Sequence, residues 1–349
     1  MFEQPDWEQP APPGARPVSF NPWRWAVVGI FGAILLVVAF FVPIPIFYAY
    51  LPGPTPAVDD LVKVDDTRTY SSEGTFLVTT VSVDIEVTFA EMIWAGFDKS
   101  KVIVDAESVT GGQSLEQLQR DQEAQMRDAN RSAEEVAFGA LGFGRPKGDG
   151  ARVLGTVRDY PAAEVLDPGD KIVAVDAHRV QTTCDVGRRI DQHEIGDEVA
   201  LTIVRKRERR VVRVRTVASP QDRGAPFLGV YMEPINYRFT PGVDVKFDPG
   251  DIAGPSAGLM FALSLYDQLT PDDLTHGQTI AGTGTISCDG GVGPIGGVEQ
   301  KVAGAEREGA EIFLSPAANF AAAKGAATDI EVVEISNFSE ALDYLEALD

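Results

Sequence analysis

Hydrophobic and polar positions divide the chain into stretches of different periodicity, the first of them continuously apolar. From Trp25 to Tyr50 the sequence carries no charge, and residues 25–42 are almost entirely apolar. About 20 such residues cross a bilayer core as a helix. Aromatic residues at both ends suit the two membrane interfaces: Trp23, Trp25, Tyr48 and Tyr50. We therefore expect residues 23–50 to form a single transmembrane anchor.

A cleaved signal peptide is the alternative interpretation of this segment. Residues 1–22 are rich in Pro and polar groups, contain three acidic residues and are expected to be disordered. That leader is too long and too acidic for a signal peptide, and no convincing A-x-A site follows. A slight charge bias predicts that the N-terminus lies on the cytoplasmic side, because Arg16 and Arg24 precede the apolar run and Asp59 and Asp60 follow it. We expect a single-pass protein of the cell membrane with its catalytic part outside the cytoplasm.

The next stretch, residues 51–138, mixes extended and helical patterns. Residues 51–56, Leu-Pro-Gly-Pro-Thr-Pro, are expected to be a stiff spacer. Apolar residues alternate with polar ones from Val81 to Phe89, which predicts a strand. A polar stretch from Ser114 to about Phe138 has helical composition. We assign residues 58–138 to a small α/β region whose role the sequence does not reveal.

From Leu141 onward the pattern changes to short strands separated by glycine turns, which predicts a β-rich domain. The expected strands are residues 153–157, 171–175, 199–204 and 211–217.

This part of the chain resembles the PDZ domains of bacterial proteases. The match is best at residues 168–176, Pro-Gly-Asp-Lys-Ile-Val-Ala-Val-Asp. The resemblance covers residues 139–218 and implies binding of extended or C-terminal peptides. It assigns the carboxylate-binding loop to Leu141, Gly142 and Phe143, whose N–H groups would face a chain terminus while a strand edge pairs with the peptide. A small glycine-bounded β domain without that role is the alternative.

Charge and cysteine content narrow the classes of partner. The 52 acidic residues outnumber the 30 basic ones, giving a net charge of -22 that disfavours nucleic acid. The one basic cluster, residues 205–215, alternates with valines and is read as the solvent face of a strand. Cys184 and Cys288 are too few for a metal site or a disulfide framework, and whether they pair stays open.

A candidate nucleophile opens an apolar helix in the C-terminal part. Residues 254–258 read Gly-Pro-Ser-Ala-Gly, so the hydroxyl of Ser256 lies at a helix start, where unpaired N–H groups favour an oxyanion. A plain helix cap is the simpler explanation of a serine there. The pattern also fits the nucleophile elbow of α/β-hydrolases, which requires an acid and then a histidine downstream. His178 and His193 precede Ser256, and His276 follows by only 20 residues, so that triad is disfavoured.

Without a suitable histidine, a lysine of lowered pKa is the candidate base. Lys301 follows Gly296-Gly297-Val298-Glu299-Gln300 and lies beside the apolar face of a predicted helix. A lysine on a helix is usually solvated. Only its combination with other motifs makes Lys301 a candidate.

That combination resembles the proteolytic domain of Lon proteases. It consists of residues 254–258, then 282–286 (Gly-Thr-Gly-Thr-Ile), then 292–297 (Val-Gly-Pro-Ile-Gly-Gly), then Lys301. The resemblance places the catalytic serine at Ser256 and the catalytic lysine at Lys301. Thr283 would help to hold the lysine, and Gly254 and Pro255 would support the serine.

The same resemblance implies an α/β domain of the ribosomal-protein-S5-like type over residues 226–349. Lon-type domains usually form rings, so it also implies a homo-oligomer. Two positions depart from the family pattern. Ala253 stands where an acidic residue is common, with Asp251 two positions away, and the strand at residues 243–247 lacks histidine.

No G-x-x-x-x-G-K-[ST] nucleotide loop occurs in the sequence. Without an ATPase motor, the expected substrates are flexible proteins or peptides, close to the membrane or presented by the PDZ-like domain.

Two other functions are compatible with some of these motifs. Residues 291–296 fit the dinucleotide fingerprint G-x-G-x-x-G, but the next strand, residues 311–316, ends without the required acidic residue. A tethered peptide-binding scaffold with an inactive Lon-like domain would share every motif. We predict an α+β chain with one transmembrane helix, a PDZ-like domain and a Lon-type Ser–Lys peptidase that needs no cofactor or metal and acts independently of ATP.

Overall fold

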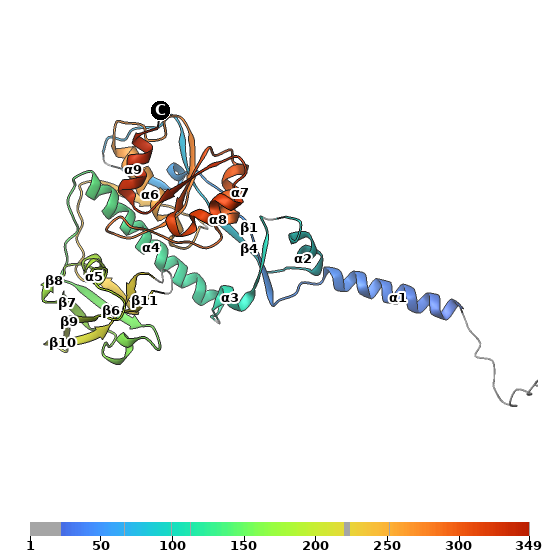
Figure 1. Cartoon of the computed structure of the whole chain (residues 1–349), viewed down its shortest axis with the longest axis horizontal. Helices are drawn as coiled ribbons and strands as arrows, with labels where there is room; N and C mark the ends of the chain where they lie inside the picture. Colours follow the sequence, from blue (N-terminus) through green and yellow to red (C-terminus); the bar gives the residue numbers. More distant parts are fainter. Residues whose placement is uncertain are drawn as a thin grey trace, which may run out of the picture.

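A long apolar helix leads into two folded regions joined by a second long helix (Figure 1). The computed structural model describes residues 22–349 with these exceptions: Asp66, Lys99, Gly112, residues 220–223, Asp251 and Asp349. The predicted disordered segment, residues 1–22, lies outside the described part except for its last residue. The architecture is a mixture of α and β elements, with one apolar helix, a β-rich domain and an α/β domain, as expected.

Helix α1 (Pro22–Phe41) projects away from the rest of the chain. Its segment Trp23–Phe41 is long and apolar enough to cross a membrane. The predicted anchor is too long at its C-terminal end, because Pro43 and Pro45 cannot continue a helix. Residues 47–52 instead form strand β1 (Phe47–Pro52).

Strand β1 lies at the centre of a small antiparallel sheet, between β4 (Val81–Asp84) and β5 (Val102–Asp105). The strand predicted from Val81 to Phe89 is shorter in the structure, because β4 ends at Asp84. The rest of the predicted stretch leads to a reciprocal capping box of Thr88 and Glu91, which starts helix α2 (Phe89–Ala95). Helix α3 (Ala106–Thr110) follows β5.

The predicted spacer is part of the folded structure. The N–H group of Gly53 donates to the carbonyl of Thr80 at 3.1 Å, which extends the β1–β4 pairing. Thr55 is buried. Residues 51–56 therefore pack against the domain instead of holding it away from lipid.

The α/β domain is built on a four-stranded parallel sheet. Its strands, in spatial order, are β19 (Glu331–Ile335), β18 (Ile312–Pro316), β15 (Thr279–Gly282) and β3 (Thr75–Val78). Side chains alternate between the two faces, so both faces need a cover of helices.

One apolar cluster contains the alternate strand residues Phe76, Ile280 and Leu314, and it packs under α6 (Gly258–Leu269), α4 (Leu115–Ala140) and α9 (Phe338–Glu346). A second cluster contains the intervening residues Leu77, Ala281 and Phe313. It packs under α7 (Val298–Arg307) and α8 (Phe320–Ala326). The domain thus has three layers, with helices on both faces of the sheet.

Residues 58–138 do not form a separate unit. Strand β3 is the edge strand of the parallel sheet, and β2 (Val62–Asp65) pairs with β14 (Asp244–Phe247). Helix α4 packs against α6. Residues 58–138, whose role the sequence did not reveal, are therefore an integral part of the α/β domain. Short helical turns η1 (Val58–Asp60) and η4 (Ala317–Asn319) belong to the same domain.

The β-rich domain has one antiparallel sheet and one helix, α5 (Thr183–Ile190). Its sheet contains β10 (Glu208–Arg215), β9 (Glu198–Arg205), β7 (Lys171–Val175), β6 (Ala151–Thr156) and β13 (Val230–Pro234), with β8 (His178–Arg179) on β7. The short elements are η2 (Pro161–Glu164), β11 (Val217–Ala218) and β12 (Pro226–Phe227).

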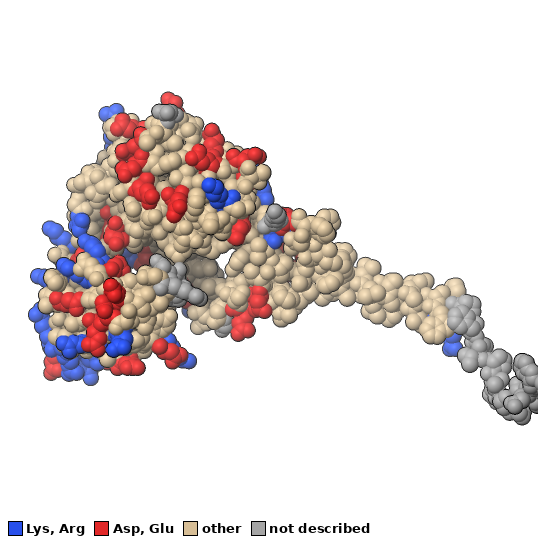
Figure 2. Space-filling model, viewed as in Figure 1, with Lys and Arg blue, Asp and Glu red and all other residues tan. Residues whose placement is uncertain are grey.

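The four strands predicted here are all present. The predicted boundary at residue 218 is too early, because β13 pairs with β6. Basic side chains gather around the β9–β10 hairpin at the far end of the domain, consistent with a solvent-facing strand (Figure 2).

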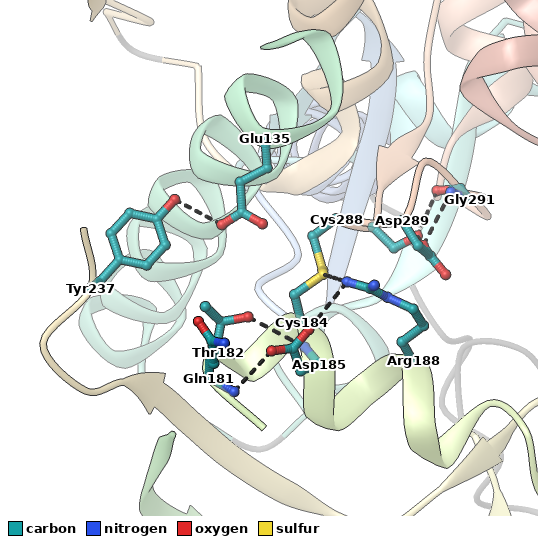
Figure 3. The surroundings of a disulfide bond; sticks show 11 residues. Glu135, Gln181, Thr182, Cys184, Asp185, Arg188, Tyr237, Cys288, Asp289 and Gly291 are labelled. Atoms are coloured by element: carbon teal, nitrogen blue, oxygen red, sulfur yellow. Dashed lines mark hydrogen bonds and ion pairs between the residues drawn. A yellow bond between two sulfur atoms is a disulfide. The ribbon is translucent and has the colours of Figure 1, made fainter. Parts of the chain in front are cut away.

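A disulfide joins the two domains. Cys184 on α5 is bonded to Cys288 in the loop between β16 (Thr285–Ile286) and β17 (Val292–Gly293), 104 residues away (Figure 3). Glu135 on α4 faces the same region and accepts a hydrogen bond from Tyr237 at 2.8 Å. The sequence left open whether these two cysteines pair, and the structure shows that they do. Their bond holds α5 beside the α/β domain.

We predict that Cys184→Ser lowers the free energy of unfolding by about 2–4 kcal/mol, because the bridge closes a long loop. Denaturant unfolding of the full chain in detergent micelles, with and without reductant, measures the change. The Cys184→Ser/Cys288→Ser variant is the control and should be insensitive to reductant. Identical unfolding of the wild type with and without reductant would contradict the prediction.

Candidate active site

The candidate active site lies where strand β15 ends and helices from opposite faces of the sheet begin. Ser256 is in the turn η3 (Pro255–Ala257), which runs directly into α6 on one face. Lys301 is in the first turns of α7, on the other face. Thr283 follows the last residue of β15. The carboxyl ends of parallel strands are the usual location of sites in α/β folds.

Glycines shape the turn that carries Ser256. Gly254 has φ 89° and ψ 164°, a backbone conformation that is essentially restricted to glycine. A Cβ atom on Gly258 would stand 2.7 Å from Cγ2 of Ile286, so the start of α6 must approach β16 closely. Pro255 begins η3, where a missing N–H group costs nothing. The Gly-Pro-Ser-Ala-Gly sequence is therefore explained by the geometry of this turn.

Lys301 reaches across from α7 to the serine. Its Nζ atom lies 2.8 Å from Oγ of Ser256 and 2.8 Å from Oγ1 of Thr283. The side chain is buried, with 3% of its surface exposed. Burial lowers the pKa of Lys301 from 10.5 to about 7, because an ammonium loses its hydration there. The neutral amine is thus well populated at neutral pH.

Thr283 fixes the relative position of the other two residues. While its Oγ1 accepts from Lys301, its hydroxyl donates to the carbonyl of Ser256 at 3.1 Å. The N–H of Gly284 donates to the same carbonyl at 2.8 Å. The buried hydroxyl of Thr79 at the end of β3 donates to the carbonyl of Gly282 at 3.0 Å, which ties down the strand end before Thr283.

A cleft of about 500 Å³ opens at Ser256 and Lys301. Part of its wall comes from segments that the sequence did not connect with the site, namely the predicted anchor, the predicted spacer and the region of unknown role. These wall residues are Tyr50, Pro54, Thr80, Val81, Ser82, Val83 and Gln122. Val81 packs on the start of α7, where a Cβ on Gly297 would stand 2.7 Å from its Cγ2. The period-two pattern at residues 81–84 was the only sequence signal for this wall.

The predicted PDZ loop has a different geometry from the one expected. The N–H groups of Leu141, Gly142 and Phe143 donate to the carbonyls of Ala137, Gly139 and Phe138 at 3.0, 3.2 and 2.9 Å. Helix α4 extends to Ala140, so these residues terminate it, with Gly142 at φ 79°. Their donors are occupied by the helix end and do not face a ligand.

A better candidate for peptide binding is the edge strand β13, which lies beside α5. A hollow of about 600 Å³ is lined by Val230, Tyr231 and Met232 of this strand and by Thr183 of α5. An exposed strand edge can accept an extended peptide as an additional strand. Residues 227–230, Phe-Leu-Gly-Val, lead into this strand and repeat the apolar–Gly–apolar pattern of residues 141–143, which could have identified it.

The structure disfavours the other candidate sites: the histidines, the glycine fingerprint and a metal site at the cysteines. His178 and His193 lie in the PDZ-like domain, where His193 bonds to Asp176 at 2.6 Å, and His276 is exposed. The glycine fingerprint at residues 291–296 spans β17, which is antiparallel to β16 and thus lacks the parallel βαβ setting of a dinucleotide site. Glu135 lies near Cys184 and Cys288, but sulfurs bonded to each other offer no thiolate to a metal.

Comparison with known proteins identifies both domains. Residues 243–345 match the Lon protease C-terminal proteolytic domain, and residues 117–216 match the PDZ domain. Lon protease 2 of Bacillus subtilis is 34% identical over 113 residues, covering 32% of this chain and 19% of that protein. Lon protease 2 of Thermus thermophilus is 40% identical over 85 residues, covering 21% and 10%.

The PDZ part has relatives of its own. A "probable periplasmic serine endoprotease DegP-like" of Brucella suis is 34% identical over 86 residues, covering 24% of this chain and 17% of that protein. Among solved structures, the PDZ domain of an SdrC-like protein from Listeria monocytogenes is similar, with 26% sequence identity and a TM-score of 0.23. The similarity covers 24% of this chain and 87% of the solved one. The PDZ assignment rests on the family model.

The chain is therefore an α/β protein in which a PDZ domain is followed by a Lon-type proteolytic domain. It spans less than a fifth of the length of each of these curated relatives.

We predict that Gly254→Ala costs about 1–3 kcal/mol in the turn, because alanine disfavours its backbone conformation. Since a Cβ there meets no atom within 4 Å, the effect comes from the backbone alone. Gly139→Ala is the matched control: it lies in α4, also meets nothing within 4 Å, and should be neutral or stabilising by up to about 1 kcal/mol. Thermal unfolding compares the two, and equal melting temperatures would contradict the prediction.

Proposed function

We propose that the chain is a membrane-anchored, ATP-independent serine endopeptidase with a Ser256–Lys301 dyad. The observation that carries this proposal is the buried amine of Lys301 at 2.8 Å from the Ser256 hydroxyl. A hydroxyl is a weak nucleophile unless a nearby base accepts its proton. The Lon-type domain found by comparison supports the same chemistry.

The reaction is acyl transfer in two steps. Neutral Lys301 accepts the proton of Ser256 while Oγ attacks the peptide carbonyl carbon, and the resulting ammonium donates that proton to the leaving amine as the C–N bond breaks. Lys301 then takes a proton from water, which attacks the ester, and returns it to Ser256 Oγ. Throughout, Nζ keeps its contact with Thr283.

Charge on the carbonyl oxygen must be stabilised during both steps. Ser256 lies in the first turn of η3, and the N–H groups of a first turn have no partner within the helix. These backbone donors are the proposed oxyanion site.

Anchoring and location follow from two further features. Helix α1 meets the length and composition of a membrane span, and we propose that it stays as an anchor. Disulfides persist in oxidising compartments, so the Cys184–Cys288 bond supports a catalytic part outside the cytoplasm. The substrates would be flexible proteins or peptides, some presented along β13, and the ring expected from Lon-type domains stays a prediction.

We expect Ser256→Ala and Lys301→Ala each to reduce cleavage of a fluorogenic peptide by roughly 10³-fold or more, because each removes one half of the dyad. Ser339→Ala on α9 and Lys324→Ala on α8 are matched controls, since both residues are exposed, and they should keep the wild-type rate. Wild-type activity in Ser256→Ala would refute the proposal. A wild-type chain that binds peptides tightly, resists a fluorophosphonate and never cleaves would instead be a peptide-binding scaffold.

The pH dependence should report Lys301. Its neutral form is the base, so kcat/KM should fall as the pH drops through about 7 and level off above that value. With an ordinary lysine pKa the neutral fraction at pH 7 would be smaller by roughly a thousandfold. Initial rates between pH 5 and pH 9 in the wild type test this, and a rate still rising tenfold per pH step up to pH 9 would contradict the proposed burial.

A further inference from the structure

Helix α2 carries a face of large apolar side chains that the rest of the described chain leaves uncovered. Phe89, Ile93, Trp94 and Phe97 recur at intervals that bring them to one side of the helix and its final turn. Trp94 is 70% exposed and Phe97 is 83% exposed. In a water-soluble domain such side chains are usually buried, so this cluster calls for a partner.

The position of α2 relative to α1 indicates that partner. The ring of Phe89, the first residue of α2, contacts the ring of Phe40 edge to face, with centroids 5.6 Å apart. The N–H of Ile44, just beyond α1, donates to the carbonyl of Val87 at 2.8 Å. The start of α2 is therefore fastened to the end of α1.

This contact sets the depth of α2. Helix α1 has 20 residues, which at 1.5 Å each gives about 30 Å, the thickness of a hydrocarbon core. Phe40 belongs to its last turn. When α1 spans a membrane, Phe89 lies at the same level as Phe40, where acyl chains meet the headgroups.

We propose that α2 is a second membrane contact, which lies in the interfacial layer of the bilayer with Phe89, Ile93, Trp94 and Phe97 in the lipid. This inference rests on the proposed anchoring by α1. Amphipathic helices bind at this level through aromatic and aliphatic side chains, and tryptophan is enriched there. The one charge within α2, Glu91, is occupied by the capping box with Thr88.

The surface around α2 supports lipid in preference to a second copy of the chain. Figure 2 shows a surface without charged residues that continues from α1 onto the adjoining part of the molecule. Ile46, which follows the end of α1, and Ile85, which precedes α2, are both exposed and extend this apolar surface. An apolar surface continuous with a membrane span meets the same bilayer without further assembly.

Such a contact would hold the catalytic cleft close to the membrane. Val83 lines the cleft and precedes Phe89 by six residues, a stretch that reaches at most about 20 Å. The substrates favoured by this arrangement are extended peptide segments at the surface of the same membrane.

Tryptophan fluorescence tests the inference, because the full chain has four tryptophans. Trp7→Phe, Trp23→Phe and Trp25→Phe together leave Trp94 as the sole emitter. A second variant with Trp7→Phe, Trp23→Phe and Trp94→Phe leaves Trp25, which reports insertion of α1. Each variant is reconstituted in vesicles of phosphatidylcholine and phosphatidylglycerol, with and without lipids brominated near the headgroup end of the acyl chain.

We expect Trp94 to emit at shorter wavelength than a hydrated indole and to lose as much emission to brominated lipid as Trp25 does. Quenching of Trp25 together with a hydrated, unquenched Trp94 would overturn the inference and leave the anchor intact. A Trp94 shielded from aqueous acrylamide but unquenched by brominated lipid would overturn it in favour of a second copy of the chain. Failure of both emitters to respond to lipid would refute the anchor itself, and the inference with it.

Discussion

Desolvation of one lysine is the constraint on which the catalytic domain depends. An ammonium group held out of water is strongly disfavoured, so the amine of Lys301 is driven toward its neutral form. The amine still needs hydrogen-bond partners in this pocket, and the hydroxyl oxygens of Ser256 and Thr283 each lie 2.8 Å from Nζ. Loss of the charge also frees a lone pair on Nζ, and that lone pair is what the proposed reaction requires to accept the Ser256 proton.

That interaction is possible because the three residues belong to different layers that meet at one edge of the sheet. Ser256 comes from the helix on one face, Lys301 from the helix on the opposite face, and Thr283 from the strand end between them. A shift of any layer would break a 2.8 Å contact. Close approaches at Gly258, Gly282 and Gly297, where a Cβ would stand within 2.7 Å of another side chain, keep the layers in place.

The sequence was sufficient to select residues that the structure brings together, but it predicted the long-range strand pairings poorly. Ser256, Lys301 and Thr283 could be identified because each lies in a short motif whose residues meet local backbone demands, such as Gly254 before the serine. The PDZ strands were visible from their local alternation. By contrast, β3 pairs with β15 about 200 residues later, and no local pattern reports such a partner. The proline-rich segment 51–56 resembles a linker by composition, whereas the hydrogen bond from Gly53 to Thr80 and the burial of Thr55 show that it is packed.

The walls of the cleft connect the candidate catalytic residues to the other parts of the chain. Strand β4 forms one wall and leads directly into α2 beside the apolar helix α1. Helix α4 contributes Gln122 to the cleft, while Gln125 and Asp128 of the same helix face the hollow beside β13. Since α4 also contacts the turn η3, a peptide held along β13 would lie against the helix that supports Ser256. If α1 anchors the chain and β13 binds peptides, as proposed, the cleft lies between the membrane contact and the peptide-binding edge.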